Sequence, residues 1–297
     1  MIVFGHNFLF VDEHMFQNAV SENDLETIRI VEHLDFGFDQ RFKLKTTWFN
    51  ASGQEVRYLS HVPFYQADKD FSWSFEIKDV VILIWDAESR KIMYIKGKNY
   101  TPERLRFWIF HTFFPIVLEL ERTYRILHVG SVEIEGRPVL FSAFSFGGKS
   151  TLTDYFIQRG HTMLSDDSLG IEKRGEEYYA IASYPFHRPY RELETLGHRI
   201  KYFITEPKPL HAVYLLEKSD SDVSVEIVKL KGIEKFKAFH HSNFINFDFM
   251  KQERFEFFSK MAKYIPVYKV TVPWDIKRLH EVYYEVCEHN GRLNSTL

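Results

Sequence analysis

The sequence is poor in cysteine and has only a small net charge. It contains a single cysteine, Cys287, and its formal net charge is -3. One cysteine excludes an internal disulfide, and a slightly acidic chain lacks the basic surface that follows a nucleic-acid backbone. We therefore expect a protein of a reducing compartment that does not bind nucleic acid.

Long apolar runs are also missing. No stretch approaches the ~18 apolar residues that a membrane-spanning helix requires, and Met1–Val11 lacks the basic segment of a secretory signal. These absences favour a cytoplasmic protein without membrane contact. With 297 residues, of which 45% are hydrophobic, the chain is long enough for a sizeable core in one or two domains.

The first 122 residues are typical of a β-rich lobe that ends in a helix. Apolar runs separated by polar turns predict antiparallel strands. The runs are Phe8–Val11, Phe42–Phe49, Phe71–Ile77, Val80–Trp85 and Lys91–Ile95. The clearest pair is a hairpin over Asp79–Gly97. Thr101-Pro102-Glu103 then predicts a helix start, and Pro115 should kink or divide this helix before its end near Arg122.

A phosphate-binding loop is the strongest signal in the sequence. A predicted strand, Val139–Ser142, leads into Ala143, Phe144, Ser145, Phe146, Gly147, Gly148, Lys149, Ser150 and Thr151. A predicted helix follows and ends at Gly160. Glycines let backbone N–H groups converge on phosphate oxygens, and a helix N-terminus adds the positive end of its dipole. Lys149 would reach the outer phosphates, and the Ser150 hydroxyl would bind Mg2+.

Two positions depart from the usual form of this loop. Ala143 stands where a glycine is usual, and Phe146 is bulky where related loops often carry glycine. Alanine tolerates a positive φ poorly, so an altered start of the loop is expected. The alternative is a Gly-Gly turn that caps an ordinary helix and leaves Lys149 in solvent. The strand before the loop and the helix after it favour phosphate binding.

Paired carboxylates follow the next predicted strand, Thr162–Ser165. One helix separates Asp166 and Asp167 from the loop, which would bring them beside the phosphates. Neighbouring strand residues face opposite sides, so both can serve one site only if the chain bends there. A helix cap or a solvated turn is the alternative. His128, near the start of a predicted strand at His128–Ile134, is by itself more typical of a core residue.

Two other groups of residues carry weaker signals. His187-Arg188-Pro189-Tyr190-Arg191 brings two arginines shortly after the carboxylates, where they could bind an anionic acceptor or simply lie in solvent. His280-Glu281 begins like a zinc-protease helix, but Tyr284 stands where the second histidine is needed. No zinc site is predicted there.

Residues 125–197 resemble the C-terminal kinase domain of HPr kinase/phosphorylase, and are more closely similar to HPr-kinase-related ATP-binding proteins. The matching residues are Leu127-His128, Gly136–Phe141, Gly148–Leu152, Arg159-Gly160, Leu164–Asp167, Tyr184–Phe186 and Leu196-Gly197. The resemblance implies an α/β (α+β) fold. A P-loop domain of the HPr kinase / phosphoenolpyruvate carboxykinase type would occupy residues 123–297, behind the β-rich lobe at residues 1–122.

The resemblance implies a kinase that uses ATP or GTP with Mg2+ and phosphorylates a Ser or Thr hydroxyl of a peptide or protein. By position Asp166 would be the base, with Lys149 and His128 as further catalytic residues, while Ser150 and Asp167 would hold the metal. The two aspartate roles could be reversed. Homologous domains self-associate, so a homo-oligomer is expected.

Two other functions stay open. One is a nucleotide-binding scaffold without catalysis, which Ala143 and Phe146 favour, and the other is an ATPase without an acceptor. The region that the bifunctional enzymes use to dock HPr is not found in this sequence, so HPr itself is a doubtful acceptor.

Overall fold

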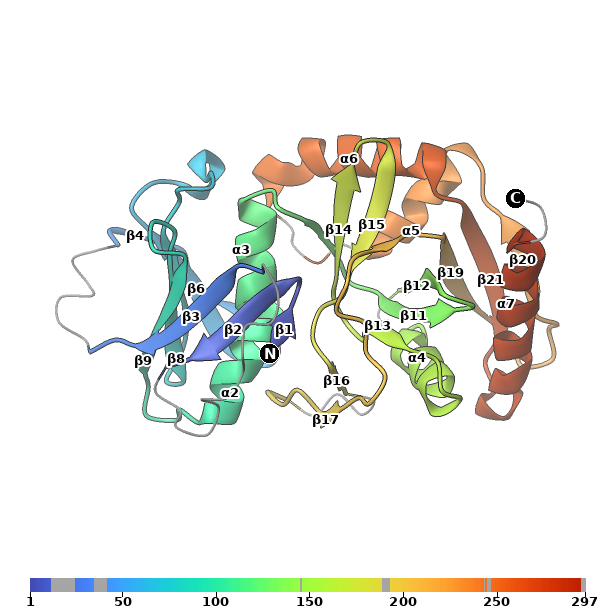
Figure 1. Cartoon of the computed structure of the whole chain (residues 1–297), viewed down its shortest axis with the longest axis horizontal. Helices are drawn as coiled ribbons and strands as arrows, with labels where there is room; N and C mark the ends of the chain where they lie inside the picture. Colours follow the sequence, from blue (N-terminus) through green and yellow to red (C-terminus); the bar gives the residue numbers. More distant parts are fainter. Residues whose placement is uncertain are drawn as a thin grey trace. The chain divides into compact units, whose positions relative to one another are not determined.

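The computed structural model describes residues 1–11, 25–34, 42–144, 146–188, 193–242, 244 and 247–294 (Figure 1). The chain forms two compact units. One comprises Met1–Tyr124 with Tyr190–Gly197, and the other Arg125–Pro189 with His198–Leu297. Within the described ranges, no helix has the length and apolar character needed to cross a membrane.

The first unit is built on a nine-stranded sheet with the order β1-β2-β3-β9-β8-β7-β6-β4, in which β5 pairs with β6. The strands are β1 (Ile2–Val3), β2 (His6–Phe10), β3 (Thr27–Glu32), β4 (Leu44–Lys45), β5 (Phe49–Ala51), β6 (Gln54–Ser60), β7 (Trp73–Ile77), β8 (Val81–Asp86) and β9 (Lys91–Lys96). The predicted hairpin is confirmed, because β8 and β9 pair antiparallel. The expectation of antiparallel strands throughout is wrong, since β3 pairs in parallel with β2 and β9 through long connections.

A three-part helix packs on this sheet. It consists of α2 (Pro102–Phe107), a π-helical segment η3 (Trp108–Phe113) and α3 (Phe114–Leu120). The Thr101 hydroxyl accepts from the N–H of Arg104 at 3.2 Å, which confirms the predicted cap. Pro115 has no N–H to donate to the preceding turn, and the helix widens into the π segment just before it. The prediction that Pro115 divides the helix is therefore confirmed.

Residues 193–197 belong to the first unit, although they follow the second unit's strands in sequence. The Glu194 carboxylate accepts hydrogen bonds from Gln54, Arg104 and the indole N–H of Trp108. A single domain boundary near residue 122 does not predict that residues 193–197 belong to the first unit. Glu194 contacts residues that lie far from it in the chain.

The second unit contains a six-stranded sheet with the order β13-β11-β12-β19-β21-β20. These strands are β11 (Gly130–Ile134), β12 (Arg137–Ser142), β13 (Met163–Ser165), β19 (Ala212–Ser219), β20 (Glu226–Lys229) and β21 (Val267–Pro273). Helices α4 (Lys149–Gln158) and α7 (Leu279–Asn294) cover one face, and α5 (Lys235–His241) and α6 (Lys251–Tyr264) lie on the other (Figure 1). The coarse expectation of a mixed α/β fold agrees with this architecture.

Smaller elements complete the two units. A four-stranded sheet has the order β10-β14-β15-β18, and β16 pairs with β17. These strands are β10 (Arg125–Leu127), β14 (Leu169–Arg174), β15 (Glu177–Ile181), β16 (Phe186–His187), β17 (His198–Arg199) and β18 (Lys208–Pro209). Short 3-10 helices are η2 (Phe64–Gln66), η4 (Gly232–Glu234), η5 (Asp248–Met250) and η6 (Ile276–Arg278).

Burial on both faces explains why the central strands are apolar throughout. Along β12, Val139 and Phe141 pack with α4 and α7, while Leu140 packs with α5 and α6. Helix α4 approaches β11 very closely, since a Cβ added to Gly130 would lie 2.1 Å from the Thr153 hydroxyl oxygen. Glycine at position 130 thus lets the helix after the loop lie against the sheet.

Strand directions bring the loop and the paired aspartates to one edge of the sheet. Strands β12 and β13 both run antiparallel to β11, so they share a direction, and β19 and β21 extend it in parallel. The carboxyl ends of these four strands therefore lie at the same edge. In open α/β sheets ligands bind in the crevice outside that edge.

Candidate functional site

The loop after β12 is a tight turn with two left-handed residues. The N–H of Gly147 donates to the carbonyl oxygen of Phe144 at 2.9 Å. Phe146 has a φ of 61° and Gly148 a φ of 87°. Ser145 lies outside the described residues. A loop of this kind turns several backbone N–H groups in one direction, as an anion-binding nest does.

Ala143 begins the loop without a left-handed backbone. Ala143 is fully buried and has no positive φ, so its methyl group meets no backbone strain. A Cβ on Gly147 would lie 2.7 Å from the Ala143 Cβ. The loop therefore accommodates alanine at its first position because glycine stands opposite it.

Phe146 is the strained residue of the loop. A left-handed backbone costs a non-glycine residue about 1 kcal/mol or more, and its side chain is 81% exposed, so burial offers no compensation. Such strain collects at ligand-binding sites, where the loop shape serves the ligand. The neighbouring Phe144 is also exposed.

Lys149 is buried at the first position of α4. Only 3% of it is exposed, and its Nζ donates to the carbonyl oxygen of Ala143 at 3.3 Å, across the loop. Lysine is almost never this buried without a specific role or partner. Lys149 is therefore not in solvent, which is the part of the alternative that this burial contradicts.

The first turn of α4 follows a glycine. Gly148 is its N-cap residue and has no side chain that could accept from the first N–H groups. Ser150 and Thr151 follow in the first turn, with Ser150 half-buried and Thr151 exposed. The N–H groups of this first turn and the helix dipole together favour an anion at this position.

Asp166 lies in a bend directly after β13 and is 7% exposed. Its Oδ2 accepts from the backbone N–H of Arg188 at 2.9 Å and lies 3.1 Å from His187 Nδ1. Among the described residues no donor reaches its buried Oδ1. A carboxylate oxygen buried in this way has a free coordination position for a cation or a hydroxyl group.

His187 connects Asp166 to the helix after the loop. Its Nε2 lies 3.0 Å from Asp154 Oδ1 on α4, and its ring is fully buried. Burial alone would lower the pKa of His187, but the carboxylates of Asp166 and Asp154 outweigh it and raise the pKa above its usual value. The His187 ring therefore lies between two carboxylates and links Asp166 to α4.

This ion-pair bridge predicts a pH-dependent stability. A raised pKa stabilises the folded chain below about pH 6.5, and this contribution is lost as the pH rises through the raised value. We expect His187→Gln to lower the free energy of unfolding by about 3 kcal/mol at low pH and by less at high pH, because it leaves the buried Asp166 carboxylate without its cation. Urea unfolding over a series of pH values measures the difference.

His198→Gln is the matched control. The exposed His198 ring packs edge-on against His187, with centroids 5.4 Å apart, but no carboxylate ion pair is found for it among the described residues. We expect His198→Gln to have little effect on the free energy of unfolding, because it leaves the buried Asp166 carboxylate with both of its partners. A difference between wild type and His187→Gln that is constant across the series contradicts a charged His187.

His128 and Asp167 form a second pair beside the first. His128 Nδ1 lies 3.2 Å from Asp167 Oδ1, and both side chains are partly exposed. The predicted strand start at His128 is wrong, because β10 ends at Leu127 and β11 begins at Gly130. The chain passes from the four-stranded sheet to the six-stranded sheet there, and His128 lies in the link.

Several participants in this site were not recognised from sequence. Asp154 had no motif, and His187 drew attention only through the arginines that follow it. Arg188 lies in the site through its backbone, and Arg191 lies outside the described residues. Tyr184 is buried, and that burial together with Asp167 and Asp166 raises the pKa of its hydroxyl. The clue available in sequence was a histidine and a tyrosine shortly after the paired aspartates.

Within the described residues, no cluster of three or more His, Cys, Asp or Glu side chains is arranged to hold a metal ion. Mg2+ does not need one, because it is usually bound through one or two carboxylates together with the phosphates of a nucleotide. The buried Oδ1 of Asp166, Asp167 and the Ser150 hydroxyl are oxygen donors of the kind that Mg2+ prefers.

No protein-family model and no curated protein matches this chain. The chain is similar to a solved structure of the Hpr(Ser) kinase/phosphatase from Coxiella burnetii, with 14% sequence identity and a TM-score of 0.35, over 58% of this chain and 99% of that chain. The similarity is one of fold alone.

Proposed function

We propose that the second unit binds ATP or GTP with Mg2+ through residues 143–151 and transfers the outer phosphoryl group to a hydroxyl. The observation that carries this proposal is the buried Lys149 side chain, which spans the loop at the N-terminus of α4. A cation, a row of backbone N–H groups and a helix dipole meet at one point, and each stabilises a polyphosphate.

The acceptor side of the site would be formed by the residues after β13. In this proposal Asp166 accepts the proton of the attacking hydroxyl, and the oxygen bonds to the outer phosphorus as the bond to the nucleoside diphosphate breaks. His187 and the N–H of Arg188 keep Asp166 in place through its Oδ2, which leaves Oδ1 for the proton. The class of acceptor is a Ser or Thr side chain of a peptide or protein.

Ser150 and Asp167 would hold Mg2+, with His128 orienting Asp167. When bound, Mg2+ neutralises charge on the outer phosphates and orients them. Lys149 contributes on the same side by neutralising the charge that develops on the leaving group. The reversed arrangement, with Asp166 on the metal and Asp167 as the base, uses the same residues and is separated by the aspartate variants discussed below.

An alternative function is a nucleotide-dependent scaffold without catalysis. The exposed rings of Phe144 and Phe146 on the loop favour it, because apolar side chains at a binding loop suit contact with another protein. Homo-oligomerisation through other surfaces fits either function.

One experiment separates these functions. ADP release from Mg-ATP is measured with and without a degenerate peptide library that carries one central Ser or Thr, alongside calorimetric binding of ATP and GTP. A kinase releases ADP in proportion to phosphopeptide, an ATPase releases it without peptide, and a scaffold binds nucleotide without release. A wild-type protein that binds neither nucleotide overturns the proposal.

A further inference from the structure

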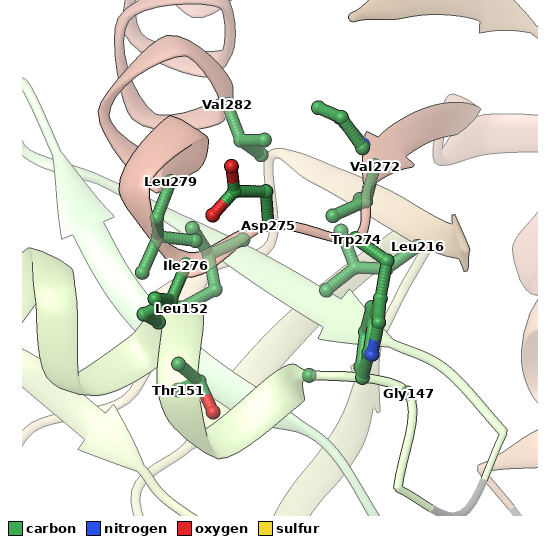
Figure 2. Close-up of a pocket in the computed structure, with 12 residues that line it drawn as sticks. Gly147, Thr151, Leu152, Leu216, Val272, Trp274, Asp275, Ile276, Leu279 and Val282 are labelled. Atoms are coloured by element: carbon green, nitrogen blue, oxygen red, sulfur yellow. The ribbon is translucent and has the colours of Figure 1, made fainter. Parts of the chain in front are cut away.

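A cavity of about 240 Å³ opens beside the phosphate-binding loop (Figure 2). Its apolar lining comes from α4, β19, β21 and α7 of the second unit, through Leu152, Leu216, Val272, Trp274, Leu279 and Val282. Gly147 and Gly148 form the side of the cavity that faces the loop. The cavity is therefore continuous with the surface where we place the phosphates.

The register of the sheet explains why the cavity lies there. Ser142, the last residue of β12, is level with Leu215 on β19, and Leu215 is level with Lys269 on β21. Both neighbouring strands continue for four further residues, to Ser219 and Pro273, as the paired positions show. Beyond the start of the loop, these extensions form a wall of the cavity. The wall lies on the side of β12 that is opposite to β11 and β13.

Trp274 stands at the end of this wall and faces the loop. A Cβ added to Gly148 would lie 3.6 Å from Cζ3 of the Trp274 ring, so the indole edge reaches this glycine. The N–H of Trp274 donates to the carbonyl oxygen of Ser219, and the Lys218 ammonium lies 4.3 Å from the ring centroid. Backbone and cation–π contacts thus hold a ring that is still 44% exposed.

We infer that this cavity binds the purine base of the nucleotide and that Trp274 is the ring on which the base rests. The inference rests on the proposed function, because the loop must hold the phosphates of the same molecule. A planar heterocycle suits an apolar cavity with one exposed aromatic wall, since stacking needs only a π face. The volume is below the roughly 300–1,000 Å³ of sites for whole drug-sized ligands, which fits a base rather than an entire nucleotide.

The site then divides the nucleotide along the edge of the sheet. The base lies on the side of β19 and β21, the phosphates lie over the loop after β12, and the reacting end points toward Asp166 after β13. Base, phosphates and acceptor would thus follow one another along the sheet in the same order as the strands that contact them. In this arrangement the apolar cavity holds the base, and Asp166 and Asp167 face the acceptor.

Trp274→Ala tests the inference, with Mg-ATP and magnesium-bound inorganic triphosphate as the two ligands. We expect the variant to bind Mg-ATP about tenfold to a hundredfold more weakly, because a stacked base is lost, and to bind the triphosphate as tightly as wild type. Trp274→Phe should retain most of the affinity for Mg-ATP. Unchanged triphosphate binding also shows that the variant is folded.

Tryptophan fluorescence gives a second readout. Trp274 is the only tryptophan of the second unit, since the other four are Trp48, Trp73, Trp85 and Trp108. Mg-ATP should quench it and the triphosphate should not. Equal Mg-ATP affinity in wild type and Trp274→Ala overturns the inference and leaves the proposed function intact. A wild-type protein that binds neither ligand overturns both.

Discussion

Lys149→Ala is expected to weaken the binding of Mg-ATP by about 100-fold or more. The ammonium group would form charge-assisted hydrogen bonds to phosphate oxygens, and losing such a group costs about 3 kcal/mol, which is more than a hundredfold in the dissociation constant. Isothermal titration calorimetry on wild type and variant measures the change. The effect should be largest for triphosphates and smaller for ADP, because the lysine reaches the outer phosphates.

Two further variants show whether a loss of binding comes from the missing charge of Lys149 or from a change in folding. Lys149→Met keeps most of the buried side-chain volume and removes only the charge, so it should bind as poorly as Lys149→Ala while unfolding near the wild-type temperature. Lys260→Ala removes an exposed lysine of α6 and should leave binding unchanged. If Lys149→Met binds Mg-ATP as tightly as wild type, the loop is not a phosphate site.

Asp166→Asn is expected to reduce phosphoryl transfer by about 10²- to 10⁴-fold while Mg-ATP still binds. Asparagine keeps an acceptor for the N–H of Arg188 but cannot take the proton of the attacking hydroxyl at neutral pH. Single-turnover phosphopeptide formation and calorimetry on one preparation separate the chemical step from binding.

Asp167→Asn completes the comparison. If Asp167 is a metal ligand, Asp167→Asn should weaken nucleotide binding mainly in the presence of Mg2+. Asp166→Asn should not show this effect. If Asp166→Asn weakens the Mg2+-dependent binding and Asp167→Asn does not, then Asp166 is the metal ligand and Asp167 is the base. Asp248→Asn serves as the control, because it alters an exposed aspartate of the second unit that pairs with Lys251, outside the site. Full transfer activity in Asp166→Asn rules out Asp166 as the base.

Local signals predicted the parts of the structure that depend on neighbouring residues. The hairpin of β8 and β9 follows from alternating apolar runs around a polar turn, and the helix cap at Thr101 from a hydroxyl before a proline. The strand, loop and helix around Lys149 were predicted because glycine and lysine spacing is itself the structure of such a loop. Gly160 ends α4 with a left-handed backbone, as expected of glycine there.

Contacts between distant segments were not predictable in this way. Parallel pairing of β3 depends on strands before and well after it, and the sheet change at His128 depends on where β14 lies. The bridge through His187 joins residues from three separate elements, none of which carries a pattern of its own. The cavity at Trp274 arises from the relative lengths of strands, which periodicity does not give.

The close approach of Ala143 and Gly147 also bears on how this loop arose. Two Cβ atoms at these positions would lie 2.7 Å apart, so only one of the two residues can carry a side chain. An ancestor with glycine at both positions could have acquired alanine at 143 at once, whereas one with a larger residue at 147 had to change there first. The loop therefore admits a side chain at position 143 and none at position 147, because a Cβ at Gly147 would also lie 2.8 Å from the carbonyl oxygen of Phe144, a contact that would remain even if Ala143 returned to glycine.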